Sequence, residues 1–219
     1  MAPGFLERLG PRDREAFEAL GTVRRFDRGD ALLRRGAPPE GVAVVLAGRV
    51  RVTSSSVGGQ DVILAFRGPG ALLGEQGALD GLPRSASVVA TEPVEALTVP
   101  GSAFRGFLDN HPRAARAVIG LLSERLRDSD RRRIEFASYG TLERLAARLV
   151  ELSMDHAREL EHGRPIQVAI TQEELAGWTA SSLESVTKSL RTLREAGWVD
   201  TGRGQLVVRD IDALVRILA

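Results

Sequence analysis

The chain has 219 residues, which is enough for one large domain or for two modest ones with their own hydrophobic cores. Its formal net charge of +1 excludes a protein that binds nucleic acid or membranes through bulk positive charge. The absence of cysteine excludes disulfides, thiolate zinc sites, cysteine-ligated iron–sulfur clusters and cysteine nucleophiles, and it fits a reducing cytoplasm. The first residues lack the basic and apolar regions of a signal peptide, and no window has the length of a membrane span. We therefore expect a cytoplasmic protein without a membrane partner.

Apolar residues recur among charged ones over residues 5–20, and Pro11 interrupts the run, so two short amphipathic helices are expected. From residue 23 to residue 100, short runs of valine, leucine and alanine are separated by glycine or proline. This spacing is typical of an antiparallel β-sandwich or barrel. Within it, residues 42–52 predict a hairpin that turns near Ala47 and Gly48. These features alone fit any small β-barrel.

The segment from Gly74 to Ala86 lies between two strand-like apolar runs and carries the groups that a sugar phosphate needs. Arg84 stands next to the hydroxyl of Ser85, and a guanidinium can pair with phosphate through two parallel hydrogen bonds. Glu75 precedes Arg84 by nine residues; it repels a phosphate but can accept a hydrogen bond from a ribose hydroxyl. The plain alternative is a surface turn with a glutamate–arginine ion pair.

A long helix is predicted after this β-rich region, beginning near Pro112 and extending to about Ser138. One of its faces carries a pattern typical of a helix that pairs with its own copy, made of Val118, Leu122, Leu126 and Ser129. Gly140 and Thr141 break the helix, and we place the boundary of the C-terminal domain there.

A short strand at residues 166–170 precedes two short helices that are joined by a tight turn at Thr179 and Ala180. Thr171 and Glu174 have the spacing of a capping box at the start of the first helix, and Ser181 and Glu184 have the same spacing at the second. The predicted buried residues are Leu175, Ala176 and Trp178 in the first helix and Val186, Leu190 and Leu193 in the second. Such a pair is a helix-turn-helix, whose second helix enters the major groove of DNA.

Residues 198–208 predict a β-hairpin that forms a wing, and Asp210 is placed to cap a final helix over 211–218. From residue 140 to the end, ten basic residues face twelve acidic ones, so this domain cannot bind DNA through bulk charge. Local donors must supply the contacts, namely Thr171, Gln172, Ser182, Ser185, Lys188, Arg191 and Arg203 in the wing.

The segment 74–86 resembles the phosphate-binding cassette of cyclic-nucleotide-binding domains, and the rest of the chain after it resembles the remainder of a Crp/Fnr-type transcription regulator. The resemblance covers nearly all 219 residues. It implies an α+β fold with a cyclic-nucleotide-binding β-roll (a double-stranded β-helix or jelly roll) over residues 1–110. A central dimerisation helix over 111–139 and a winged helix-turn-helix DNA-binding domain over 140–219 complete the expected chain.

The resemblance also assigns the nucleotide contacts. The family's cassette glutamate, here Glu75, holds the ribose 2′-hydroxyl, and its arginine and serine, here Arg84 and Ser85, hold the cyclic phosphate. The remaining contacts fall on Gly74 and Gln76 through their backbone, on Ala86 by packing, on Arg125 beside the phosphate and ribose, and on Ser129 and Asp130 at the adenine amino group. Asp130 departs from the usual hydroxyl or amide, because a buried carboxylate costs several kcal/mol unless it is paired. Arg131 or Arg133 could pair with it.

The resemblance adds Leu183 and Glu184 to the local donors and supports Lys188, because a glutamate and a basic residue of the family's recognition helix match Glu184 and Lys188. The expected DNA contacts are therefore Thr171, Gln172, Ser182, Leu183, Glu184, Ser185, Lys188 and Arg191. Close relatives of the cyclic-AMP receptor read guanine with an arginine at the position that Leu183 occupies. A leucine can only touch a thymine methyl there or pack inward beside Val186, so a guanine-centred half-site is not assumed. Ala180 replaces the glycine that is common in the turn, and we expect little effect because alanine tolerates most turn geometry.

The resulting hypothesis is a homodimeric transcription regulator that binds a pseudo-palindromic DNA operator and works with RNA polymerase. Cyclic AMP is the expected ligand, with cyclic GMP or no ligand as alternatives, and no metal, haem or iron–sulfur cluster is expected. Ligand binding would lengthen or stiffen the helix around Ser138 to Thr141 and rotate the two DNA-binding domains of the dimer. The rival interpretations are a haem, oxygen or redox sensor, a regulator with a vestigial nucleotide site, and an enzyme. The sequence shows no nucleophile–base pair, metal cluster or phosphate-binding Walker loop that would support an enzyme.

Overall fold

The structure is a computed structural model, and it describes residues 3–55, 61–154, 166–168, 170–202 and 205–218. Contacts between residues divide the chain into two compact units, residues 2–127 and residues 128–219. The boundary falls inside one long helix, α4 (Pro112–Ser138). None of the described helices is long and apolar enough to cross a membrane.

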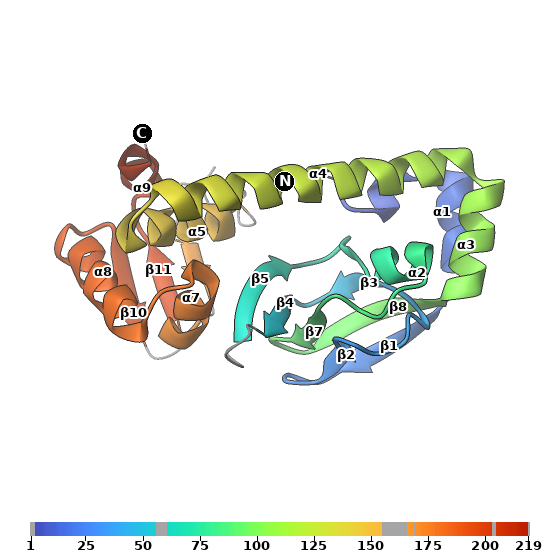
Figure 1. Ribbon diagram of the computed structural model, residues 1–219, viewed down its shortest axis with the longest axis horizontal. Helices are drawn as coiled ribbons and strands as arrows, with labels where there is room; N and C mark the ends of the chain where they lie inside the picture. Colours follow the sequence, from blue (N-terminus) through green and yellow to red (C-terminus); the bar gives the residue numbers. More distant parts are fainter. Residues whose placement is uncertain (1–2, 56–60, 155–165, 169, 203–204, 219) are drawn as a thin grey trace. The chain divides into compact units, whose positions relative to one another are not determined.

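The N-terminal unit begins with the two short helical segments that the sequence predicts, a 3₁₀ turn at Leu6–Arg8 and α1 at Pro11–Glu18. The strands after them are β1 (Thr22–Phe26), β2 (Ala31–Leu33), β3 (Gly41–Ala47), β4 (Val50–Ser55), β5 (Asp61–Arg67), β6 (Leu72–Leu73), β7 (Ser87–Ala90) and β8 (Val94–Pro100). Helix α2 (Glu75–Asp80) lies between β6 and β7, and α3 (Gly101–Asn110) leads into α4. The strands form two antiparallel sheets in the orders β1-β8-β3-β6 and β2-β7-β4-β5 (Figure 1).

Alternation along the central strands builds two layers of core, because successive side chains of a strand point to opposite faces. Val42 and Val44 of β3 join a cluster with four phenylalanines of the flanking helical segments, Phe5, Phe17, Phe104 and Phe107. The rings of Phe5 and Phe107 meet the Phe17 ring edge-on, with centroids 5.1 and 5.2 Å away. Ala43 and Val45 join a second cluster with residues of β4, β6, β7 and β8, and this cluster fills the space between the sheets. The predicted β-sandwich is therefore confirmed.

The predicted hairpin at residues 42–52 is wrong in its pairing. Both strands exist, but in the described residues β3 pairs with β8 and β6, whereas β4 pairs with β5 and β7. A strand buried on both faces, as β3 is, needs neighbours within its own sheet, so the chain crosses from one sheet to the other. Gly48 makes this corner with a φ of +80°, and a Cβ on it would lie 2.2 Å from the Pro93 carbonyl oxygen.

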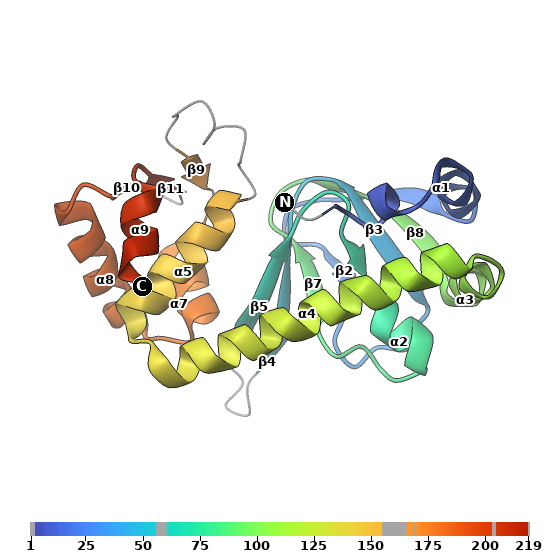
Figure 2. The ribbon, with the colours of Figure 1, turned by 90° about the horizontal axis from the view of Figure 1, so that it is seen from above.

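The C-terminal unit contains the end of α4, then α5 (Thr141–Met154), β9 (Ile166–Val168), α7 (Gln172–Thr179), α8 (Leu183–Glu195), β10 (Val199–Gly202), β11 (Gln205–Val208) and α9 (Ile211–Ile217). The strands form one antiparallel sheet in the order β10-β11-β9, and α5 packs against α7, α8 and α9 (Figure 2). Helices α7 and α8 are the predicted helix-turn-helix, and β10 with β11 is the predicted wing. The predicted loop over residues 155–165 lies outside the described residues.

The predicted caps are confirmed at two helices and wrong at a third. Thr171 Oγ1 accepts a hydrogen bond from the Glu174 amide at 3.1 Å, and the Glu174 carboxylate accepts one from the Thr171 amide at 2.9 Å. Asp210 likewise accepts from the Ala213 amide at 2.8 Å. Helix α8, however, is capped by Ser182, which accepts from the Ser185 amide at 3.1 Å. Ser181 does not serve as the cap because its hydroxyl lies 3.1 Å from Nη2 of Arg144 and bonds within the turn.

Candidate functional site

The cassette segment begins at Gly74, between β6 and α2. Gly74 has a φ of +78°, a conformation that glycine adopts without steric penalty. A Cβ on it would lie 2.6 Å from Nη1 of Arg84, so the close approach of this arginine also requires glycine. Helix α2 ends at Gly81, which has a φ of +74°, and the chain then returns toward β7. The two glycines thus bring Arg84 back against the start of the segment, ten residues earlier in the chain.

Arg84 is a buried cation, with 6% of its surface exposed. Its Nη1 donates to the Gly74 carbonyl oxygen at 2.6 Å, and its Nη2 donates to the Gly41 carbonyl oxygen of β3. Burial lowers the pKa of the Arg84 guanidinium, and the nearby carboxylates of Glu75 and Glu40 oppose this shift. Both acceptors of the guanidinium are neutral carbonyl groups. A neutral carbonyl oxygen binds a guanidinium less strongly than an anionic oxygen does.

Glu75 is more deeply buried, with 2% of its surface exposed. Its Oε1 accepts a hydrogen bond from Nη1 of Arg125, whose Nη2 donates to the Leu72 carbonyl oxygen at 2.5 Å. Its Oε2 has no hydrogen-bond partner among the described residues. A buried carboxylate oxygen without a donor is costly, so this atom marks a place where a donor from outside the chain would be stabilising.

A pocket opens beside these side chains. Ser85 Oγ donates to Gln76 Oε1 at 3.2 Å at its rim. Of the sequence-predicted nucleotide contacts, seven line this pocket together: Gly74, Glu75, Gln76, Arg84, Ser85, Ala86 and Arg125. The arrangement offers three guanidinium groups, those of Arg67, Arg84 and Arg125, together with the Ser85 hydroxyl and one unpaired carboxylate oxygen of Glu75 around a single cavity.

The second helix of the helix-turn-helix presents the polar face that the sequence predicts. Val186, Leu190 and Leu193 are buried, whereas Glu184, Thr187, Lys188 and Arg191 are exposed and Ser185 is half-buried. Leu183 is 45% exposed, so it does not pack inward with Val186 as one alternative had it. Ser182 is exposed, Thr171 and Gln172 are half-buried, and Arg203 lies outside the described residues.

Three residues of this face already have side-chain partners, and the first is Ser185, whose Oγ accepts a hydrogen bond from Ser182 Oγ at 2.9 Å. Thr187 Oγ1 donates to Gln172 Oε1 at 2.9 Å and so joins α8 to the start of α7. Arg191 Nε lies 2.7 Å from Glu195 Oε1, and this hydrogen bond raises the pKa of the exposed Arg191 guanidinium. With Arg191 paired to Glu195, little unpaired positive charge is left on this face of α8, in agreement with the excess of acidic residues in the domain.

Comparisons with known proteins agree with both halves of this arrangement. Residues 23–111 match the family of cyclic nucleotide-binding domains, and residues 143–217 match the Crp-like helix-turn-helix domains. The chain is 31% identical to the cyclic AMP receptor protein of Thermus thermophilus, and the alignment covers 95% of this chain and 94% of that protein. The chain belongs to the Crp/Fnr family of transcription regulators. As a member of that family it is a DNA-binding regulator with a cyclic nucleotide-binding domain, and not an enzyme.

Two less similar proteins show how far the likeness extends. A CRP-like cAMP-activated global transcriptional regulator of Mycobacterium tuberculosis is 24% identical over 87% of this chain and 85% of its own length. The solved structure of the c-di-GMP responsive global regulator CLP of Xanthomonas campestris is 21% identical, with a TM-score of 0.77. The match covers 92% of this chain and all of the Xanthomonas campestris chain. At this level of identity, the likeness shows that the two proteins share a fold and nothing more.

Two of the nucleotide contacts that the Crp/Fnr resemblance assigns are not among the pocket-lining residues. Ser129 and Asp130 are exposed residues of α4 on the C-terminal side of the unit boundary. Asp130 lies 3.9 Å from Nη1 of Arg133, and 58% of its side chain is exposed. In the single chain this carboxylate therefore avoids the desolvation that the sequence led us to expect, while Arg133, one of its two expected partners, is found beside it.

The predicted seam of α4 is divided by the structure. Val118 is only 2% exposed and belongs to the core of the N-terminal unit, and Leu122 is partly buried against the same core. Leu126 is 64% exposed, and so is Ile119, at 62%, one heptad before it. A helix that also covers its own β-sheet must use one side for that purpose, so the exposed apolar face turns toward Ile119 and Leu126.

Sequence reasoning missed the pocket's apolar wall. Leu33, Val52, Leu73 and Val88 line the pocket from β2, β4, β6 and β7. Only the pairing of strands in two sheets brings these side chains together, and the sequence contains no local signal for that pairing. Across the part of the chain that the structure describes, no three His, Cys, Asp or Glu residues are grouped to hold a metal ion.

Proposed function

We propose that this regulator is a homodimer whose DNA binding is controlled by a cyclic nucleotide, cyclic AMP first, bound in the cassette pocket. The observation that carries the proposal is the unpaired, buried Oε2 of Glu75 in a pocket that also holds Arg84 and Ser85. An acceptor that lacks a donor suits a ribose hydroxyl, and a guanidinium beside a hydroxyl suits a phosphate. The pocket supplies both at once.

The state of Arg84 explains how a phosphate could be captured. Its guanidinium is bound to the carbonyl oxygens of Gly74 and Gly41, and hydrogen bonds from a guanidinium to an anionic oxygen are stronger than those to a neutral carbonyl oxygen. A cyclic phosphate can therefore draw the guanidinium toward the pocket, where Ser85 Oγ adds a second donor. Arg125 holds the other oxygen of Glu75 and so keeps the free oxygen oriented.

The long helix supports the homodimer. Ile119 and Leu126 leave an exposed apolar ridge on α4, which a second copy of the helix would cover. Ser129 and Asp130, exposed further along the same helix, would meet the nucleobase from their own chain or from the partner chain. We keep the division into a nucleotide domain over 1–110, a dimerisation helix over 111–139 and a DNA-binding domain over 140–219.

A dimer would place its two α8 helices in successive major grooves, about 34 Å apart on a pseudo-palindromic operator. The proposed contacts are Thr171, Gln172, Ser182, Leu183, Glu184, Ser185, Lys188 and Arg191. Since the domain is acidic overall and offers few cations to DNA phosphates, we expect its affinity for DNA to be modest without a well-matched operator. RNA polymerase is a proposed partner, and the cytoplasm is the proposed location.

A second candidate is a regulator with a different signal or with none. The Xanthomonas campestris regulator with the same fold is described as responsive to c-di-GMP, so the fold does not determine the ligand. Asp130, at a position where the family has a hydroxyl or amide, also favours a changed base preference.

The test is calorimetric titration of the full chain with cyclic AMP and with cyclic GMP. We expect one nucleotide to bind, and Arg84→Ala to weaken that binding by about 2–5 kcal/mol, roughly 30-fold or more, because it removes a buried charge partner. Ser85→Ala tests the same phosphate contact without disturbing the buried bonds of Arg84. Arg14→Ala, which breaks an exposed pair with Glu18, is the matched control and should bind normally.

The possible outcomes separate the two candidates. Tight binding that Arg84→Ala and Ser85→Ala leave unchanged would refute the cassette assignment. Absence of binding by either nucleotide would favour the second candidate and direct attention to Asp130.

A further inference from the structure

Arg148 of α5 is a buried arginine that the nucleotide pocket does not use. Only 4% of its surface is exposed. Its Nη1 donates to Glu151 Oε2 at 2.7 Å, its Nη2 donates to the Glu135 carboxylate, and its Cζ lies 5.6 Å from the centre of the Trp178 ring. A single guanidinium thus contacts α4 through Glu135, α5 through Glu151, and α7, the first helix of the helix-turn-helix, through Trp178.

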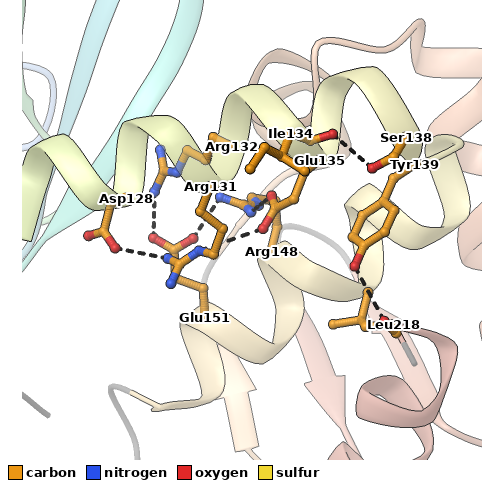
Figure 3. A network of polar contacts seen from close by, with 10 residues as sticks. All are labelled: Asp128, Arg131, Arg132, Ile134, Glu135, Ser138, Tyr139, Arg148, Glu151 and Leu218. Atoms are coloured by element: carbon orange, nitrogen blue, oxygen red, sulfur yellow. Dashed lines mark hydrogen bonds and ion pairs between the residues drawn. The ribbon is translucent and has the colours of Figure 1, made fainter.

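Further arginines extend this contact into a chain of alternating charge (Figure 3). Arg132 Nη2 lies 2.6 Å from Glu151 Oε1, so both oxygens of Glu151 face a guanidinium. Arg131 lies 3.7 Å from the other oxygen of Glu135 and 3.0 Å from Asp128. Three arginines therefore alternate with three carboxylates, and four of the six residues belong to the segment 128–135 of α4.

A second group of bonds fixes the elbow where α4 gives way to α5. Arg144 Nη1 donates to the Tyr139 carbonyl oxygen at 2.9 Å, and its Nη2 donates to Ser181 Oγ at 3.1 Å, in the turn before α8. The Tyr139 hydroxyl donates to the Leu218 carbonyl oxygen at 3.3 Å, after α9 (Figure 3). The elbow is thus bound both to the helix-turn-helix and to the last helix of the chain.

These contacts bear on where the molecule can bend. A change of angle at residues 138–141 would separate Glu135 from Arg148 and Tyr139 from Arg144. Among the described residues, the buried Arg148 would then keep a single carboxylate partner, Glu151. The compact C-terminal unit accordingly begins at Asp128, before the elbow. The sequence predicts that ligand binding lengthens or stiffens the helix around Ser138 to Thr141, whereas these contacts hold the joint within the chain itself.

We propose that Arg148 is a positioning residue for DNA recognition, which fixes residues 128–138 of α4 and the helix-turn-helix as one rigid body. Any rearrangement of the recognition helix must then carry the end of α4 with it instead of turning about the elbow. The rigid joint stands on the contacts above; its use in nucleotide control rests on the proposed function.

The experiment measures a distance across the elbow in the full-length protein. Because the chain has no cysteine, Arg133→Cys on α4 and Thr192→Cys on α8 give two unique sites for spin labels at exposed positions. Labelled chains are diluted into an excess of unlabelled chains, so that electron–electron resonance reports distances within one chain. We expect a single narrow distance peak, and we expect Arg148→Met or Glu135→Gln to broaden or split it.

Arg209→Gln is the matched control, because it breaks an ion pair with Asp200 in the same unit that is about half exposed on both sides. It should leave the peak narrow. Circular dichroism identifies any variant that fails to fold. If Arg148→Met fails to fold, Glu135→Gln alone serves as the test variant. A peak that is as broad in the parent as in Arg148→Met and Glu135→Gln would overturn the proposal.

Cyclic AMP, whose binding is checked by calorimetry, supplies the second arm. We expect it to leave the 133–192 distance unchanged while it alters a second pair, Glu15→Cys with Thr192→Cys, that joins the two units. A shift of the 133–192 distance on binding would place the bend at the elbow and overturn the rigid body. If cyclic AMP does not bind, the proposal that it is the ligand is refuted. The comparison of the parent with Arg148→Met and Glu135→Gln then still decides whether the joint is rigid.

Discussion

The nucleotide pocket and the elbow both combine glutamates with a buried arginine, Arg84 in one and Arg148 in the other, but they differ in how completely the carboxylates are paired. At the pocket, Glu75 gives one oxygen to Arg125 and keeps the other without a partner among the described residues. At the elbow, both oxygens of Glu135 and both of Glu151 face guanidinium groups. Incomplete pairing leaves affinity for something from outside, whereas complete pairing uses that affinity within the fold. The same residue types therefore make a binding site in one unit and a joint in the other.

The two buried arginines sharpen this contrast. Burial lowers the pKa of Arg84 and of Arg148 alike, so the direction of the shift does not separate them. Their partners do: Arg84 is bound to backbone carbonyl oxygens, whereas Arg148 is bound to two carboxylates. A guanidinium held by neutral groups gains when a phosphate arrives, and one held by anions does not.

The largest effect is expected from breaking the elbow. Arg148→Met should lower the free energy of unfolding of the C-terminal unit by about 3 kcal/mol, the lower end for a broken buried pair, since Arg131 and Arg132 still face the two glutamates. Both tryptophans of the chain, Trp178 and Trp198, belong to this unit, so their fluorescence in a urea titration reports it selectively. Arg209→Gln removes a half-exposed pair and should change the same quantity by less than about 1 kcal/mol. Equal losses in the two variants would mean that burial of the network contributes nothing.

The next effect is expected at the pocket, from two matched substitutions. Glu75→Gln should weaken nucleotide binding by about 1.5–3 kcal/mol, roughly 10- to 150-fold, because a charge-assisted hydrogen bond is lost. It should destabilise the free protein less than Glu135→Gln does, since the charge it removes is only half paired. Glu135→Gln should show the reverse, with lower stability and unchanged nucleotide affinity. Calorimetry and urea unfolding of both variants check this, and equal loss of affinity in both would remove the distinction between site and joint.

Local signals explain which parts could be predicted from the sequence. The cassette lies within one short segment, so Gly74, Glu75, Arg84 and Ser85 could be assigned together, and the structure brings them around one pocket. The capping box at Thr171 and the buried face of α8 also follow from spacing within a single helix. Strand pairing could not be predicted in this way, because the partners of β3 lie about thirty and fifty residues further along the chain.

The elbow was missed for a related reason. Arg131, Arg132 and Glu135 belong to a charged run that, in the sequence, is indistinguishable from a solvated helix face. Only the folded unit buries Arg148 and brings it to Glu135, thirteen residues earlier in the chain. Similarly, Val118 had the spacing of a dimer seam, but the β-sheet of its own unit covers that side of the helix.

The smallest change in stability is expected at the turn between α7 and α8. Our expectation that alanine is tolerated there without cost is wrong. Ala180 has a φ of +44°, and it is the only non-glycine residue with positive φ in the described part of the chain. This conformation costs a residue with a Cβ about 1–2 kcal/mol, whereas glycine loses about 0.5–1 kcal/mol more entropy on folding. Ala180→Gly should therefore stabilise the C-terminal unit by about 0.5–1 kcal/mol, measured by the same tryptophan signal. Ala196, which caps α8 with a φ of −76°, gives the control: Ala196→Gly should stabilise nothing. If Ala180→Gly proves less stable than the parent, the turn is not strained. Ala180 would then stabilise the helix-turn-helix for a reason other than backbone geometry.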